Sequence, residues 1–146
     1  MADDRDDSYL PNYFGIEIEG IECGKFTRCE GLESENYVYE VEEGGLNTTT
    51  HKFLGRTRFP NLVLEKGLTD NNEIYSWYHN TVETEDAVVR KDGSVILFNA
   101  AGEEVKRWNF FRALPCRWVG PQLGQTVHGC AVERIEIMHE GLEEAE

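Results

Sequence analysis

The chain has 146 residues, of which 40% are hydrophobic and 11% aromatic, and a formal net charge of −14. This length suits one domain with its own core, and the composition is too apolar for a disordered chain. Binding to nucleic acid through its phosphates needs clustered Lys and Arg, so the acidity disfavours that function. No stretch resembles a membrane helix, and residues 1–7 lack the basic flank and apolar run of a secretion signal. We therefore expect synthesis in the cytoplasm and no membrane anchoring.

Acidic residues are concentrated at the two ends of the chain. Residues 1–45 hold 13 acids against 3 bases, residues 46–132 hold 9 against 10, and residues 133–146 hold 6 against 1. The sequence predicts three parts: a flexible acidic N-terminal arm over residues 1–12, a single domain over residues 13–142, and an acidic C-terminal tail over residues 143–146.

Two strands are predicted in the first third of the chain. Residues 14–19 alternate apolar and polar side chains with a period of two, which is typical of a half-buried strand. Residues 37–42 do the same and end at Gly44-Gly45, a pair that indicates a special backbone conformation or a close approach. In the second strand we expect Tyr37, Tyr39 and Val41 to face inward and Glu40 and Glu42 to face outward.

The middle of the chain predicts one loop, one strand and one helix. Residues 46–60 are rich in Thr and basic residues, which favours an extended loop or an open hairpin. A strand is predicted over residues 61–66. The helix is predicted over residues 71–83, because Asp70 and Glu73 have the spacing of a capping box. Its core residues are expected at intervals of three to four positions: Ile74, Trp77 and Tyr78.

The remaining chain predicts a series of strands. They are expected over residues 88–90, 94–99, 105–110, 116–119 and 130–139, with turns at Asp92-Gly93, Ala101-Gly102 and Gly120-Pro121. The total is about eight short strands and one helix, without a repeat. This pattern predicts a mainly β fold, an antiparallel β-sandwich or barrel of about eight strands with one flanking α-helix.

Catalytic and metal-binding patterns are weak. The cysteines Cys23, Cys29, Cys116 and Cys130 lack the spacing of a zinc site and are interpreted as reduced thiols. The histidines His51, His79, His128 and His139 are scattered without metal spacing. A Cys–His pair at His128 and Cys130 would need an activated thiol in a cleft. We expect no enzymatic activity, no catalytic residues, no metal and no cofactor.

Several motifs together carry a family resemblance. They are Glu43-Gly44-Gly45, Asn47, His51-Lys52, Gly55-Arg56, Phe59, Leu62, Leu64, Lys66-Gly67, Thr69 and Trp77, then Trp118-Val119-Gly120-Pro121 with Leu123, and finally Glu136 to Leu142. This pattern closely resembles the tail-tube family of contractile phages and extracellular contractile injection systems, from about residue 14 to residue 142. One departure is Leu54, where many members have proline.

The resemblance implies a structural function. It implies a tail-tube fold similar to that of type VI secretion tubes, rings of six subunits whose inner sheets join into a cylinder, and stacked rings that form a hollow tube. Sheath contraction would drive this tube through a target envelope. The implied partners are further copies of the chain, a sheath protein, baseplate or tube-initiating proteins, a terminator cap, and cargo or DNA in the lumen, within a phage tail or a released injection particle. The alternatives are a monomeric small-ligand-binding β-barrel and a tube–baseplate adaptor.

Charge suggests how rings could stack. A tube that elongates needs a head-to-tail contact between two different surfaces of identical copies. The candidate bases for such a contact are His51, Lys52, Arg56 and Arg58. We hypothesise that the loop over residues 46–60 projects toward the neighbouring ring and pairs its bases with acids there. The alternative is a solvated loop with ordinary surface charge.

Charge also suggests a lining for the channel. The outward acids of the predicted strands are Glu17, Glu19, Glu40, Glu42 and Glu136. If they face the lumen, like charge in a narrow tube keeps nucleic acid or acidic cargo from sticking. The alternative is that these acids lie on a solvated outer face.

Overall fold

The computed structural model describes residues 13–19, 21–42, 44–45, 49–67, 73–83, 89–124 and 132–145. These residues form ten strands and one helix. The elements are β1 Tyr13–Ile18, β2 Ile21–Phe26, β3 Arg28–Glu30, β4 Glu35–Val41, β5 His51–Arg58, β6 Leu62–Gly67, α1 Glu73–Glu83, β7 Lys91–Phe98, β8 Glu104–Val119, β9 Val132–Met138 and β10 Gly141–Glu144. None of the described helical residues forms a segment long and apolar enough to cross a membrane.

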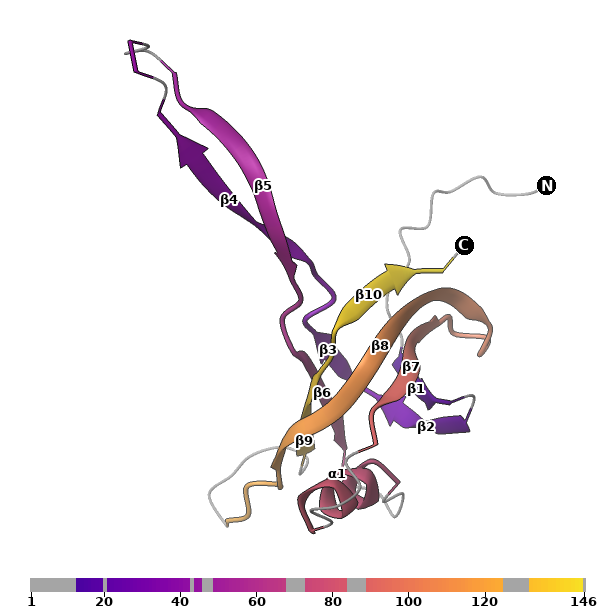
Figure 1. Cartoon of the computed structure of the whole chain (residues 1–146). Coiled ribbons are helices and arrows are strands. Elements are labelled where there is room, and N and C mark those ends of the chain that lie inside the picture. Colours follow the sequence, from indigo (N-terminus) through magenta and orange to yellow (C-terminus); the bar gives the residue numbers. More distant parts are fainter. Residues whose placement is uncertain are drawn as a thin grey trace, which may run out of the picture.

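Eight strands form one antiparallel sheet that closes on itself. Their order is β2-β1-β7-β8-β9-β6-β3, and β10 pairs with β8. The two ends of this order, β2 and β3, are consecutive in the chain and separated only by Thr27. The backbone N–H of Thr27 donates to the carbonyl of Glu65 in β6 at 2.9 Å, which fastens this crossing point. The predicted fold class is confirmed: the structure is barrel-like and antiparallel, with α1 packed against β8 at one end (Figure 1).

The longest strand, β8, replaces two predicted strands. Its first half pairs with β7 on one edge and β10 on the other, and its second half pairs with β9. Between the halves, Arg112 adopts φ 50°, a left-handed conformation that is uncommon for residues with a side chain. The strands predicted over residues 105–110 and 116–119 are therefore the two halves of one bent strand.

The turn predicted at Asp92-Gly93 is wrong. Both residues lie inside β7, at a shift in the pairing register with β8 between Lys91 and Gly93. The Asp92 carboxylate accepts the backbone N–H of Arg112 at 2.9 Å, so the acid belongs to a bulge that matches the bend of β8. The strand predicted over residues 88–90 is also not observed, because residues 89 and 90 precede β7 without joining it.

The remaining strand predictions mostly agree with the structure. The strands predicted over residues 14–19 and 61–66 correspond to β1 and β6, and the helix corresponds to α1. The turn at Ala101-Gly102 is observed, with the Gly102 N–H donating to the Asn99 carbonyl at 3.0 Å. Three short strands, β2, β3 and β10, were not predicted, and β5 lies in the segment that was predicted as an extended loop or an open hairpin. Strand β10 extends into the predicted acidic tail, since Glu143 and Glu144 pair with β8.

The core lies between the facing walls of the closed sheet. Its buried members are Ile16, Ile18, Phe26, Leu62, Leu64, Val95, Phe110, Ala113, Ile135 and Ile137. Trp77 and Tyr78 of α1 are partly buried and pack against this cluster, while the Ile74 side chain lies outside the described residues. The helix therefore closes one end of the barrel through its aromatic residues.

The inward orientation predicted for Tyr37, Tyr39 and Val41 is wrong. These side chains are 60%, 54% and 47% exposed. Strand β4 pairs only with β5, and the two form a separate hairpin that projects away from the barrel (Figure 1). Alternation determined correctly which side chains share a face, but it carries no information on whether the chain itself covers that face.

Replacing Ile137 with alanine is expected to reduce the free energy of unfolding by about 2–4 kcal/mol, because its fully buried side chain leaves a cavity between β9 and β6. Leu54→Ala on the hairpin is the matched control, since Leu54 is 71% exposed, and it is expected to change stability by less than about 0.5 kcal/mol. Urea unfolding of unassembled protein measures both values. Equal losses in the two variants would contradict the assigned core.

Cys29 is expected to make stability fall at alkaline pH. Burial, together with the neighbouring Glu30 carboxylate, raises the pKa of the Cys29 thiol from 9.0 to about 12. The protonated thiol is thus favoured in the fold, and its stabilisation is full below pH 9 and lost as the pH rises toward 12. Between pH 8 and pH 10.5, urea unfolding should show that the wild type loses about 1–2 kcal/mol more than Cys29→Ala. Parallel pH profiles for the two proteins would refute the assignment.

Candidate assembly surfaces

One face of the β4–β5 hairpin is aromatic and uncovered. Tyr39 lies opposite Phe53, and Val41 lies opposite His51, so these side chains share a face. The Tyr39 and Phe53 rings stack with centroids 5.7 Å apart and an angle of 24° between their planes. Tyr37 is on the same face by strand alternation. We call Tyr37, Tyr39, Val41 and Phe53 the aromatic face of the hairpin; each of them is at least 47% exposed.

The opposite face of the hairpin mixes apolar and charged residues. Val38 lies opposite Leu54, and Glu40 lies opposite Lys52. Nearer the body, Arg58 lies opposite Glu35. The proposed stacking bases therefore occupy β5, with acids of β4 beside two of them. Within the described part of the chain, Lys52, Arg56 and Arg58 form no ion pair, which leaves their charge available to another molecule.

The predicted glycine turn lies between the two strands of this hairpin. Gly45 has φ 101°, in the left-handed region that glycine adopts without strain. A Cβ atom on Gly44 or Gly45 would meet nothing within 4 Å. Backbone conformation, and not a close approach, is therefore the reason for glycine at position 45.

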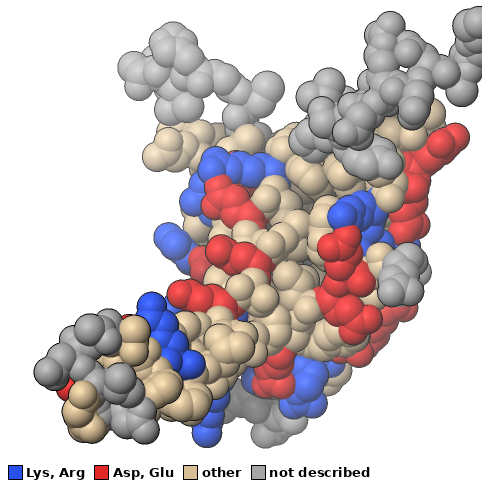
Figure 2. Space-filling model, turned by 90° about the horizontal axis from the view of Figure 1, so that it is seen from above, with Lys and Arg blue, Asp and Glu red and all other residues tan. Residues whose placement is uncertain are grey.

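The five predicted lumen acids do not form one cluster. Glu40 and Glu42 belong to the hairpin, whereas Glu17, Glu19 and Glu136 belong to the body. On the face shown in Figure 2, acidic side chains lie beside basic ones across the body and form no patch of one sign.

Two of the body acids are neutralised by arginine. Arg107 of β8 donates to both carboxylate oxygens of Glu17, at 3.4 and 3.3 Å, and to Glu104 at 2.7 Å. The hydrogen bond from Arg107 holds the pKa of Glu104 below its ordinary value. Glu136 accepts from the Asn61 amide at 2.9 Å and lies 4.0 Å from Arg117. Glu17 and Glu136 thus contribute less negative charge to a channel wall than the sequence suggests.

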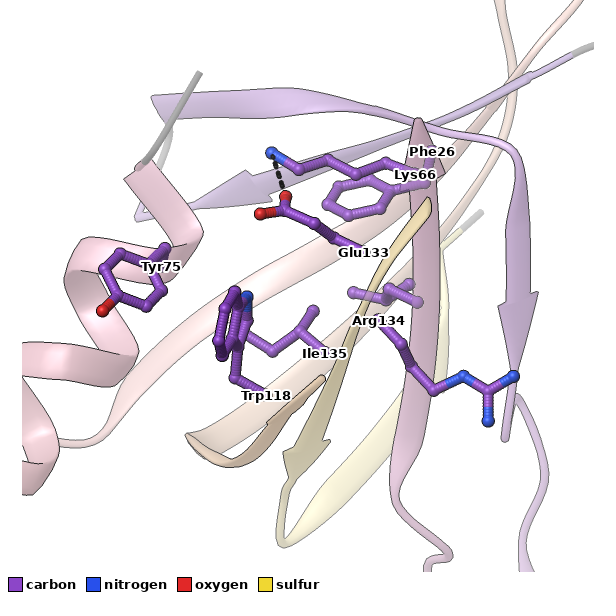
Figure 3. A pocket seen from close by; sticks show the side chains of 8 residues that line it. Phe26, Lys66, Tyr75, Trp118, Glu133, Arg134 and Ile135 are labelled. Atoms are coloured by element: carbon purple, nitrogen blue, oxygen red, sulfur yellow. Dashed lines mark ion pairs between the residues drawn. The ribbon is translucent and has the colours of Figure 1, made fainter. Parts of the chain in front are cut away.

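A small pocket of about 10 Å³, the space of one water molecule, lies at the α1 end of the barrel, between the helix and the sheet. Its rim includes Tyr75 of α1 and Trp118 of β8, whose rings meet edge to face with centroids 5.0 Å apart. Its apolar lining comes from three strands: Phe26, Leu64 and Ile135. Figure 3 shows the Tyr75 and Trp118 rings facing the same space, to which α1 contributes one wall.

An ion pair lies beside this apolar lining. Lys66 Nζ is 3.7 Å from Glu133 Oε2, and both side chains are largely buried. Arg134 also borders the pocket, but its guanidinium points away from it (Figure 3). That group donates to Glu65 at 2.9 Å on the other side of the sheet. The pocket therefore combines an aromatic rim with a neutralised charge pair.

Gly120 and Pro121 follow β8 directly at this end of the barrel. A Cβ atom on Gly120 would lie 2.9 Å from the Trp118 ring, so glycine allows the chain to pass close to the indole. The sequence singled out Trp118 as part of a family motif, but it did not single out Tyr75. Single aromatic residues in a sequence do not indicate such a pocket rim, because the rim is formed by two segments that lie far apart in the chain.

The four histidines lie in different places along the chain, and one of them lies outside the described residues. His139 is buried, with Nδ1 2.9 Å from the Gly141 carbonyl and Nε2 3.1 Å from the Pro60 carbonyl, which is a structural role. His51 and His79 are exposed, and His128 and Cys130 lie outside the described residues. Among the residues that are described, no group of His, Cys, Asp and Glu side chains could hold a metal ion.

Known structures share this fold. A chain of the PVC sheath-tube complex, from an extracellular contractile injection system in its extended state, matches with a TM-score of 0.81 and 22% identity, covering 97% of this chain and 93% of that one. A chain of the anti-feeding prophage cap, the AFP tube terminating cap, matches with a TM-score of 0.75 and 27% identity over 99% and 100%. Hcp1 from Flavobacterium johnsoniae gives 0.53 and 15% over 90% and 94%.

Comparison with models of protein families gives a match over most of the chain. No curated protein matches the chain. The family model for the T4-like virus tail tube protein gp19 matches residues 10–143, which include the helix and every described strand except the last residue of β10. The chain, a closed antiparallel barrel with a projecting hairpin, therefore belongs to the T4-like virus tail tube protein family.

Proposed function

We propose that this chain is the inner-tube subunit of a contractile injection system or a contractile phage tail. It forms rings of six copies, which stack into a hollow tube that sheath contraction drives through a target envelope. The protein acts by assembly and performs no chemistry. Family membership supports this function, and the observation that carries it is the uncovered aromatic face of the hairpin.

The projecting hairpin is an unfavourable structure for a protein that remains a monomer. A two-stranded hairpin is at best marginally stable in water, because it has no layer to pack against. Among the described strands, β4 and β5 pair only with each other, and they expose apolar side chains on both faces. Contiguous exposed apolar surface of this kind is typical of an interaction site. A neighbouring copy in the tube would supply the missing layer.

Basic residues on β5 are proposed to orient one ring relative to the next in this contact. His51, Lys52, Arg56 and Arg58 lie on the projecting hairpin, where they can reach acids of the next ring. Each exposed ion pair contributes only about 0–1 kcal/mol, but six copies repeat it around a ring. These bases are proposed to set register, while the aromatic face supplies most of the affinity.

The remaining partners follow from the proposed machine. The similar chains come from a sheath-tube complex, a baseplate and a tube terminating cap. We therefore propose a sheath protein, baseplate or tube-initiating proteins, and a terminator cap as partners, with cargo or DNA in the lumen. Synthesis in the cytoplasm precedes incorporation into a phage tail or a released particle. The lumen is proposed to be lined by outward acids, among which Glu19, Glu40 and Glu42 carry the charge that arginine does not neutralise.

The small-ligand barrel is disfavoured by how the barrel interior is filled. Side chains such as Phe110, Val95 and Ile137 are fully buried between the walls, where a ligand would have to bind. The pocket near Tyr75 and Trp118 borders this core at its helix end and has room for only about one water molecule. The described interior is therefore that of a packed structural protein.

Purified protein is expected to form rings and tubes as its concentration rises, because each copy presents apolar surface that only another copy covers. Size-exclusion chromatography and negative-stain microscopy measure this assembly. Protein that stays monomeric at high concentration, even with baseplate components added to start growth, would refute the proposed function.

The double variant Lys52→Glu/Arg56→Glu is expected to stop tube growth while its circular dichroism spectrum and urea midpoint stay unchanged, because both side chains are exposed on the hairpin. Lys25→Glu/Lys106→Glu is the control, since it makes the same charge change on exposed residues of the body. Sedimentation of tubes at equal protein concentration compares the two. Normal tube yield from the hairpin variant would show that its bases have no part in stacking.

A further inference from the structure

The core face of the ladder between β6 and β9 carries an ion pair at the end nearest α1. Three directly opposite pairs of side chains share this face: Leu62 and Ile137, Leu64 and Ile135, and Lys66 and Glu133. The four apolar members are at most 4% exposed. The face therefore consists of two apolar pairs followed by one charged pair.

The ion pair lies where water has little access. Lys66 is 7% exposed, and no other Lys or Arg among the described residues is buried. Its Nζ atom is 3.7 Å from Glu133 Oε2 (Figure 3) and 6.0 Å from the centroid of the Phe26 ring, whose face attracts a cation. The adjoining pocket has room for about one water molecule. A charge that lost its partner at this position would therefore be poorly hydrated.

We propose that the Lys66–Glu133 pair specifies the register in which β6 and β9 join. A slip of two residues keeps the alternating side chains on the same faces, so alternation alone does not exclude it. A slip in one direction would place Lys66 opposite Ile135, and a slip in the other would place Glu133 opposite Leu64. Both arrangements bury a charge without its counter-charge, which is strongly destabilising.

The connection between the two strands does not fix their register. In a hairpin the turn does so, but α1, β7 and β8 lie between β6 and β9 in the chain. On the outer face of the same ladder, Glu65 lies opposite Arg134 and accepts from its guanidinium at 2.9 Å. The Arg134 side chain is 47% exposed, so water can replace much of this contact after a slip. The pair on the core face is therefore the stronger determinant.

Polar contacts at the far end of the ladder favour the same register. His139 Nε2 is 3.1 Å from the Pro60 carbonyl, and the Asn61 amide donates to Glu136 at 2.9 Å. A slip would break these hydrogen bonds. Their loss costs less than the burial of a charge without its partner, because the net contribution of a single hydrogen bond is modest.

The register of β6 also sets where the hairpin leaves the barrel. Strand β6 begins at Leu62, soon after β5 ends at Arg58. A slip of two residues would move the base of the hairpin by about 7 Å along β9. Identical copies form a regular assembly only when they present the same surfaces in the same places. The ion pair thus makes the position of the hairpin uniform among copies.

Apolar replacement of the pair tests the proposal. Lys66→Met/Glu133→Leu should remain folded, because replacement of a buried ion pair by apolar residues is often neutral or stabilising. With the register no longer specified, nuclear magnetic resonance of unassembled protein should show a second set of β6 and β9 amide signals, with about 10% or more of the intensity. Cross-strand nuclear Overhauser effects identify the slipped pairs, and tube yield should fall. Contacts of the native register alone would overturn the proposal.

The neighbouring position of the same ladder supplies the matched control. Glu65→Leu/Arg134→Met removes the ion pair on the outer face and leaves Lys66 and Glu133 in place. This variant should give one set of amide signals with the native cross-strand contacts. Equal heterogeneity in the two double variants would show that the core-face pair does not select the register.

A charge swap tests the pair even if the apolar variant fails to fold. Lys66→Glu and Glu133→Lys each place like charges opposite one another, so each should lower the urea midpoint. Lys66→Glu/Glu133→Lys restores opposite charges and should recover most of the loss, together with a single register. A swap no more stable than the single variants would overturn the proposal. Wild-type protein with one register that forms no tubes would contradict the proposed function and leave this inference standing.

Discussion

The bend in β8 is the constraint on which the rest of the structure depends. One half of this strand is held by β7 and β10, and the other half by β9, so a single strand belongs to both walls of the barrel. The left-handed conformation of Arg112 makes the change of direction, and the Asp92 carboxylate binds the backbone N–H released there. Because the two walls share β8 and also the β2–β3 crossing at Thr27, their apolar faces must meet, and the core follows.

Closure of the barrel also decides what is left outside it. The sheet uses eight strands, and β4 and β5 have no place in it, so they pair with each other and project. His139 anchors the return of the hairpin to the body by contacting the Pro60 carbonyl. The fold thus buries its core side chains and leaves apolar side chains exposed on the hairpin and near α1. A protein with this division is stable as a unit and remains able to associate with copies of itself.

Acidic charge has a different role in the body from the one its sequence suggests. Glu65 and Glu136 lie in reach of Arg134 and Arg117 on neighbouring strands, because antiparallel pairing brings positions far apart in the chain side by side. Glu17 of β1 pairs with Arg107 of β8 across the intervening strand β7. Such pairs on the outer face contribute little to stability but reduce repulsion in a chain with a net charge of −14. Much of the remaining acid lies at the chain ends and in the segment around α1.

The sequence by itself determined the local elements: alternation predicted β1, β6 and β9, helical spacing predicted α1, and family motifs predicted the tail-tube fold. It could not reveal β2, β3 and β10, which are short and depend on pairing partners, nor the unity of β8, which depends on one backbone conformation at Arg112. Alternation placed Tyr37 and Tyr39 on one face, but only the tertiary structure decided that no other part of the described chain covers it. The contact between Tyr75 and Trp118 at the pocket rim was equally hidden, since the two rings meet only when helix and strand pack. The period of a strand shows which of its side chains share a face and not what packs against that face.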